Sequence, residues 1–190
     1  VVKFRNSSGN VDALMTIFAT QVVVIGQDGQ GSLGIMYAIF GVGALLGPIL
    51  LNRWNDGTPQ VMRGLIMIGF VLIVFGWVVI GWSGTLWILL FGLFLRAMGG
   101  SANWTYSTII IQKTTPNAYL GRMFSLDMMA YYVATVASTL IHGQLIDYFG
   151  AANVRNAALV MIVPSALILL AWIRIARWVA QHHPVTATPT

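Results

Sequence analysis

The sequence predicts an all-α protein, a polytopic membrane helix bundle with six transmembrane helices. Of its 190 residues, 57% are hydrophobic and only 8% are charged, whereas soluble domains carry about 25% charged residues. Apolar stretches long enough to cross a bilayer core of roughly 30 Å also recur between short polar links. This combination does not fit a soluble globular enzyme.

Six stretches are expected to form the spans, because backbone amides in lipid must bond within their own segment. The five clear stretches are residues 33–51, 64–82, 86–111, 123–146 and 157–173. The first stretch, residues 11–25, is weaker because it is short and polar, with Asp12, Thr16, Thr20 and Gln21 in it.

Three regions follow from these spans. Residues 1–10 are expected to be an N-terminal cytoplasmic segment or the truncated start of the first span. Residues 11–178 form the six-span transmembrane domain. Residues 179–190 are polar and proline-bearing, which predicts a disordered cytoplasmic tail.

The distribution of Lys and Arg predicts the orientation. If both termini are cytoplasmic, the outer links hold only Arg155, and the inner segments hold the other residues of this kind outside the membrane, namely Lys3, Arg5, Arg53, Arg63, Lys113, Arg122, Arg174 and Arg177. This excess satisfies the positive-inside rule. We therefore expect a multi-pass protein of the cell membrane, in a bacterium the cytoplasmic membrane, with both termini inside.

Metal, cofactor and nucleic-acid binding are not expected. The chain has no cysteine and three histidines, and the adjacent pair His182 and His183 supplies too few ligands for a metal. The net charge of +5 comes from basic residues that are scattered singly, which is not the clustered face that binds phosphate backbones.

Arg96 is the main candidate for a functional residue, because it lies about ten residues inside a predicted span, where a guanidinium group is costly. It either lines an aqueous path or holds a counter-ion, or it caps carbonyls in a packed interior. Asp12 and Asp127 are possible partners. Asp12 is the better candidate, because Asp127 lies only about 6 Å from the cytoplasmic end of its span.

Other polar or small residues within the spans have both a functional and a packing interpretation. Asn103 and Tyr106 follow Arg96 in the same span and either face water or form interhelical hydrogen bonds. Gly41, Gly43 and Gly47 form small-residue steps that permit close helix packing. His142 is either a proton relay or a hydrogen-bonded packing residue.

Gly81-Trp82-Ser83-Gly84 matches the Gly-x-Ser-Gly of rhomboid intramembrane proteases, with His142 as a possible partner of Ser83. A tight helix hairpin favours the same residues. No histidine precedes residue 140, so that family's earlier oxyanion-stabilising histidine has no counterpart.

Two longer segments carry a family resemblance. GSLGIMYAIFGVGALLGPILLNR, at residues 31–53, and IQKTTPNAYLGRMFS, at residues 111–125, resemble the eighth span and the loop after the tenth span of major facilitator superfamily transporters. The chain is similar to the C-terminal half of bacterial exporters of siderophores and drugs. HGQLIDYFG, at residues 142–150, resembles the outer end of the eleventh span.

The resemblance implies half of a twelve-helix fold that works by alternating access. The first, second, fourth and fifth spans would then line the substrate or proton pathway, and the third and sixth would face lipid. The pathway candidates are Asp12, Arg96, Asn103, Tyr106, Asp127 and Tyr131. The candidates for helix packing or gating are Gly41, Gly43, Gly47, Arg53, Gly121 and Arg122.

The expected function is therefore secondary active transport, proton-coupled efflux of a small organic molecule, and not an enzyme activity. The expected partners are the lipid bilayer, the substrate, and either a missing N-terminal half or a second copy. The alternatives are a non-transporting six-helix scaffold or assembly protein and, more remotely, an intramembrane serine protease. A transporter half should expose a polar wall, whereas a self-sufficient bundle should bury Arg96.

Overall fold

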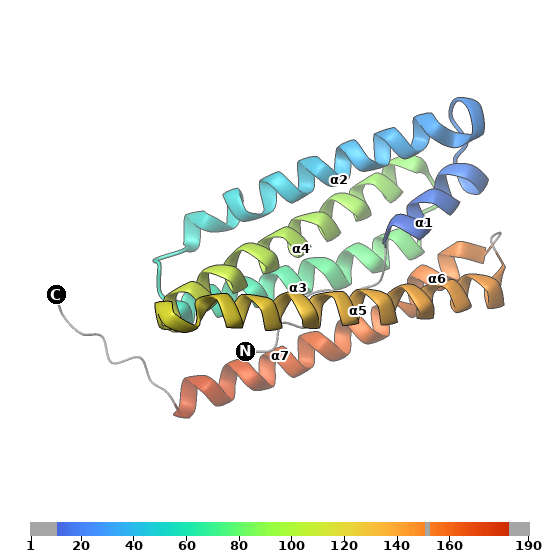
Figure 1. The fold of residues 1–190 in the computed structure, drawn as a ribbon. Coiled ribbons are helices and arrows are strands. Elements are labelled where there is room, and N and C mark those ends of the chain that lie inside the picture. Colours follow the sequence, from blue (N-terminus) through green and yellow to red (C-terminus); the bar gives the residue numbers. More distant parts are fainter. Residues whose placement is uncertain (1–10, 151–152, 183–190) are drawn as a thin grey trace.

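The computed structural model describes residues 11–150 and 153–182, and every regular element in these ranges is helical. The longer helices are α2 (Gln30–Leu51), α3 (Pro59–Gly81), α4 (Leu86–Thr114), α5 (Leu120–Phe149) and α7 (Ile162–His182). The short ones are α1 (Val11–Ile17), η1 (Phe18–Val22), η2 (Gln27–Gly29), η3 (Asn52–Trp54), η4 (Asn117–Tyr119) and α6 (Val154–Val160). They form an elongated bundle (Figure 1).

Five helices in the described residues are long and apolar enough to cross a membrane. Their bounds are Gln27–Trp54, Pro59–Gly81, Leu86–Thr114, Asn117–Phe149 and Val154–Val179. They correspond to the five clear stretches of the sequence, and successive helices run antiparallel as the short links require (Figure 1).

The weaker first stretch forms a shorter helix than a span needs. After α1 the chain makes a π-helical turn, η1, and leaves the helix at Val23 with φ −131° and ψ 85°. The Ser32 hydroxyl at the start of α2 then donates to the Val23 carbonyl and accepts from the Ile25 amide at 2.9 Å. Residues 1–10, expected to precede this stretch, lie outside the described residues.

α3 and α4 share the most extensive helix contact in the described bundle. Their backbones approach closely because glycines face each other: a Cβ added at Gly92 would lie 2.8 Å from Ile80 Cγ1 and 3.1 Å from the Gly76 carbonyl oxygen. Gly69 and Gly99 form a second facing pair. Small residues let membrane helices gain contact where lipid provides no hydrophobic drive.

α3 is not simply the lipid-facing helix that the family resemblance implies. Met62, Ile73 and Trp77 are buried against neighbouring helices, whereas Val71 and Phe75 are exposed. The helix is apolar all round, so one face packs into the bundle and the other is suited to lipid.

The last span is interrupted and longer than expected. α6 ends and α7 begins at Met161, three residues before Pro164, whose ring cannot fit against the preceding turn of a regular helix. α7 then continues to His182, so residues 179–182 are helical and not part of a disordered tail. Residues 183–190, including His183, lie outside the described residues.

The helix directions gather the basic side chains at one end of the bundle. This end, where α2, α4 and α7 finish and α3 and α5 begin, carries Arg53, Arg63, Lys113, Arg122, Arg174 and Arg177. Arg155 lies at the opposite end, at the start of α6. Lys3 and Arg5, counted with the first group, lie outside the described residues.

Candidate functional site

Arg96 lies in the middle of the bundle, ten residues after the start of α4 at Leu86, which is roughly 15 Å along the helix axis. Its side chain is 7% exposed. The guanidinium carbon sits 4.8 Å from the ring centroid of Trp77 on α3, which is cation–π geometry. Gly76 leaves room for it, since a Cβ there would lie 2.9 Å from Arg96 Cβ.

Asp12 links Arg96 to two further elements. Its carboxylate exerts a favourable electrostatic effect on Arg96. The same carboxylate accepts a hydrogen bond of 3.2 Å from the Tyr37 hydroxyl of α2. Asp12 of α1 therefore contacts Tyr37 of α2 directly, and its negative charge favours the charged form of Arg96 on α4. We call Asp12, Tyr37 and Arg96 the central polar cluster.

The polar side of α1 extends from this cluster. Asp12, Thr16, Thr20 and Gln21 are exposed, whereas Leu14 and its apolar neighbours are buried. The Thr16 hydroxyl donates to the Asp12 carbonyl at 2.9 Å, and the Thr20 hydroxyl donates to the Thr16 carbonyl at 2.9 Å. Asp12 and Thr16 belong to α1, and Thr20 and Gln21 belong to η1, which continues it. We call these four exposed residues the α1 polar face.

Asn103 and Tyr106 face neighbouring helices. Asn103 is 2% exposed, and its amide fills the space above Gly69 of α3. The buried Tyr106 side chain donates a hydrogen bond of 3.2 Å from its hydroxyl to the Pro48 carbonyl of α2. Both residues therefore connect α4 to its packing partners in this conformation.

Asp127 and Tyr131 lie on α5. Asp127 is buried at 7% exposure. Tyr131 is half-buried and meets Trp104 of α4 edge-on, with ring centroids 5.5 Å apart. Aromatic contact thus joins α5 to α4 at a point where the two helices otherwise touch little.

The candidate packing glycines of α2 differ from one another. Gly43 and Gly47 lie directly against the α4 backbone at Phe94 and Met98, where a Cβ has no room. A Cβ at Gly41 would meet no atom within 4 Å. The sequence step that brings α2 onto α4 is therefore Gly43-x-x-x-Gly47.

The candidate gating residues lie at the end of the bundle that carries most basic side chains. Arg53, in η3, and Arg122, at the start of α5, are exposed. A Cβ at Gly121 would meet no described atom within 4 Å. Beside them, Lys113 Nζ of α4 donates to the Gly57 carbonyl at 2.6 Å, which ties the α2–α3 link to α4.

Sequence reasoning missed Trp77, Tyr37 and the facing glycines. The available signal is a spacing: Gly69 and Gly76 are seven residues apart on α3, as are Asn103 and Arg96 on α4. Seven residues are close to two helical turns, so each glycine accommodates one polar side chain of the antiparallel neighbour. Gly69 lies against Asn103 and Gly76 against Arg96.

The protease alternative finds no assembled site in the described side chains. Ser83 is buried in the α3–α4 turn, and the side chain of His142 lies outside those described. In the described part of the chain, no three His, Cys, Asp or Glu residues are grouped to hold a metal ion.

Comparison with known proteins identifies the family. A sequence model described as Major Facilitator Superfamily matches residues 10–189. No curated protein and no solved structure matches the chain. The family match covers all five long helices together with α1 and the central polar cluster, and it agrees with the all-helical membrane architecture. This multi-pass membrane protein belongs to the Major Facilitator Superfamily, whose members are secondary transporters and not enzymes.

Proposed function

We propose that this chain is the C-terminal half of an export-type transporter that moves a small organic molecule out of a bacterial cell in exchange for protons. Family membership supports a secondary transporter of small molecules. Export, proton coupling and the assignment to one half rest on the resemblance of residues 31–53 and 111–125. The gathering of basic side chains at one end supports an orientation with that end in the cytoplasm.

The central polar cluster is the observation that carries the proposal. Charged groups within a membrane bundle are expensive and mark substrate, ion or proton paths. Asp12 acts on Arg96 and also accepts from Tyr37. Protonation of Asp12 would remove its negative charge and weaken its role as an acceptor, so proton binding would weaken its contact with Tyr37 of α2 and its attraction to Arg96.

The α1 polar face provides the wall that a transport path requires. Asp12, Thr16, Thr20 and Gln21 are exposed on a helix whose opposite side is apolar and buried. In hydrocarbon such a face is unfavourable, whereas it is suited to an aqueous cavity shared with another six-helix unit. That unit is the N-terminal half or a second copy.

The burial of Arg96 favours the second candidate, a self-sufficient scaffold bundle. Arg96 lies against Trp77 and Gly76 of the adjacent helix α3. Two neighbouring helices of one half, α3 and α4, bury Arg96 in this way, and they would do so in a transporter as well as in a scaffold protein. The scaffold hypothesis does not explain why the α1 polar face is exposed, whereas a transport path does. Transport is therefore the better-supported function.

The test is energised export from cells that carry variants in the complete native gene. Ethidium is the probe, and the readout is its efflux rate after glucose addition, with and without a protonophore. We expect Asp12→Asn and Arg96→Gln each to slow protonophore-sensitive efflux about tenfold or more. Asp147→Asn is the matched control, because Asp147 is an exposed aspartate near the C-terminal end of α5 and outside the central polar cluster.

Protein level and monodispersity in detergent must match the wild type for the comparison to count. Wild-type rates in both cluster variants would show that the cluster is structural and would refute the proposed mechanism. Wild-type cells without protonophore-sensitive ethidium efflux above that of a gene deletion would contradict the proposed export of such a compound.

A further inference from the structure

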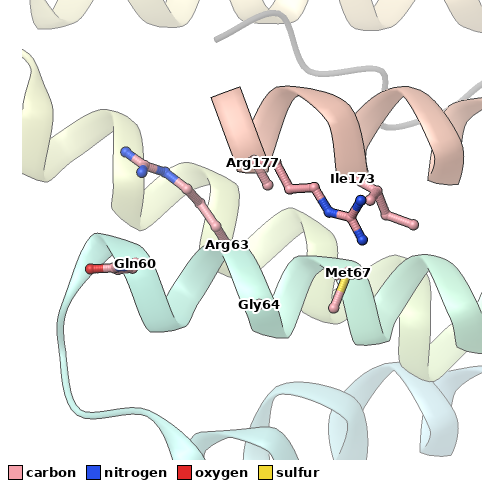
Figure 2. Close-up of a pocket in the computed structure, with 7 residues that line it drawn as sticks. Gln60, Arg63, Gly64, Met67, Ile173 and Arg177 are labelled. Atoms are coloured by element: carbon pink, nitrogen blue, oxygen red, sulfur yellow. The ribbon is translucent and has the colours of Figure 1, made fainter. Parts of the chain in front are cut away.

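A pocket lies between the first turns of α3 and the last turns of α7, away from the central polar cluster. It has a volume of about 340 Å³ and is lined by Gln60, Arg63, Gly64, Met67, Ile173, Ala176 and Arg177. Figure 2 shows that α3 and α7 form its two walls. We call it the α3–α7 pocket.

Two arginines, one from each helix, give the pocket its charge. Figure 2 shows the Arg177 guanidinium in the space between α7 and α3, near Ile173 and Met67, whereas the Arg63 side chain extends from α3 in the other direction, toward the Gln60 end of the helix. Arg63 is half-buried and Arg177 is exposed. The residues that line the pocket include two cationic side chains and no acidic one.

The floor of the pocket is apolar and leads to a surface suited to lipid. Gly64, Met67 and Ile173 carry no polar side-chain group that binds water strongly. Exposed apolar side chains continue along the same helix at Ile68 and Val71. A bound molecule would therefore meet positive charge at the end of the bundle and hydrocarbon further along α3.

The two walls are held in place by a contact inside the bundle. Trp172 of α7 donates from its indole nitrogen to the Arg63 carbonyl at 3.2 Å. The same indole packs against Phe70 of α3, with ring centroids 6.1 Å apart. This contact fixes how far α7 lies from α3, so the pocket is part of the packed structure.

We propose that the α3–α7 pocket binds the headgroup of an anionic phospholipid from the leaflet at the end that carries most basic side chains. Guanidinium groups bind phosphate through paired hydrogen bonds, and basic pockets between membrane helices are suited to acidic lipid headgroups. Arg177, whose guanidinium lies between the two helices, would contact the phosphate, and Arg63 would add positive charge at the Gln60 end of the pocket. An acyl chain would extend past Met67. Charge complementarity and the adjoining apolar surface favour a lipid over a soluble anion.

The experiment measures lipid preference of the intact protein in nanodiscs. Spin-labelled phosphatidylglycerol and spin-labelled phosphatidylcholine are compared by electron paramagnetic resonance as the fraction immobilised at the protein. We expect wild-type protein to prefer phosphatidylglycerol, and the double variant Arg63→Gln/Arg177→Gln to reduce this preference about fivefold or more.

The matched control is Arg122→Gln/Arg174→Gln, which removes the same charge from exposed positions at the same end of the bundle and outside the pocket lining. It is expected to retain most of the preference. An equal loss in both double variants would show a diffuse attraction and would overturn the proposal.

A second measurement tests whether inorganic phosphate competes with the spin-labelled lipid. At matched ionic strength it is expected to leave the spin-labelled lipid in place, and complete displacement would indicate a soluble-anion site instead. Because the pocket arginines are exposed or half-buried, both variants are expected to remain folded, which gel filtration and circular dichroism check.

Discussion

The crossing of α3 and α4 allows a sharp test at Gly76. Replacing Gly76 with Ala places a methyl group 2.9 Å from three atoms of α4, namely the Cβ and amide nitrogen of Arg96 and the carbonyl oxygen of Gly92. These atoms belong to the backbone or are fixed to it, so no rotamer change can relieve the contact. The two helices must therefore separate.

The size of the effect follows from the contact distances. Restoring ordinary van der Waals contact requires a shift of roughly 0.5 Å, which forfeits about a quarter of the dispersion energy of the neighbouring contacts. Overpacking of this kind costs about 1–3 kcal/mol, and alanine returns about 0.5–1 kcal/mol of helix propensity. We expect Gly76→Ala to lower the free energy of unfolding by up to about 2.5 kcal/mol, the overpacking cost less the propensity gain.

Gly64→Ala is the control on the same helix, because a Cβ at Gly64 meets no atom within 4 Å. Without a clash the propensity gain remains, so Gly64→Ala is expected to be neutral or to stabilise by up to about 1 kcal/mol. Unfolding in mixed detergent micelles with increasing dodecyl sulfate, followed by tryptophan fluorescence, measures both. Equal stability of the two variants would refute the argument that the glycine contacts determine how closely α3 approaches α4.

Two further variants remove side-chain hydrogen bonds, and their effects are measured as shifts in the unfolding transition. Tyr106→Phe removes the bond to the Pro48 carbonyl and is expected to cost about 0.5–1.5 kcal/mol, measured by the same dodecyl sulfate titration; an unchanged midpoint would contradict this. Thr58 caps α3 by accepting from the Val61 amide at 3.3 Å, so Thr58→Ala should cost about 1 kcal/mol. Hydrogen bonds from the Thr58 side chain and then its backbone hold the pKa of Asp56 below its ordinary value of 3.8. The stability that Asp56 contributes is therefore present above that value and lost as the pH falls through the lowered pKa, and the acid-side decrease in thermal midpoint should be smaller in Thr58→Ala.

The positions of the long helices were predictable because the bilayer allows few solutions. A chain in hydrocarbon must satisfy its backbone within each span, so apolar length alone locates a helix. Residues 86–111 were expected as a span, and α4 is Leu86–Thr114. The break at Met161 was not predicted, although Pro164 in an otherwise apolar stretch is a residue that can interrupt a helix.

The buried faces of the helices were not predictable from hydrophobicity. Lipid is as apolar as a packed interior, so a helix such as α3 shows no contrast between its two sides. Only the spacing of Gly69 and Gly76 marks the face that meets α4. The sequence therefore predicts that α3 crosses the membrane and leaves its rotation undetermined.

Part of the central polar cluster was predictable. The depth of Arg96 follows from its place within a long apolar run. The preference for Asp12 over Asp127 as its partner rests on helix rise and stays a prediction. Trp77 could not be distinguished from other aromatic residues of an apolar span. Tyr37 could not be predicted either, because its contact with Asp12 depends on how the chain bends between α1 and α2.

The glycine contacts also bear on how the molecule moves. At Gly43 and Gly47 of α2 and at Gly76 of α3, the nearest atoms of α4 belong to its backbone or are fixed to it, so they cannot absorb a displacement by a change of rotamer. A force applied to one of these three helices therefore shifts the other two with it, as one solid block. α5 touches its neighbours sparsely, so sliding during a transport cycle would occur along α5.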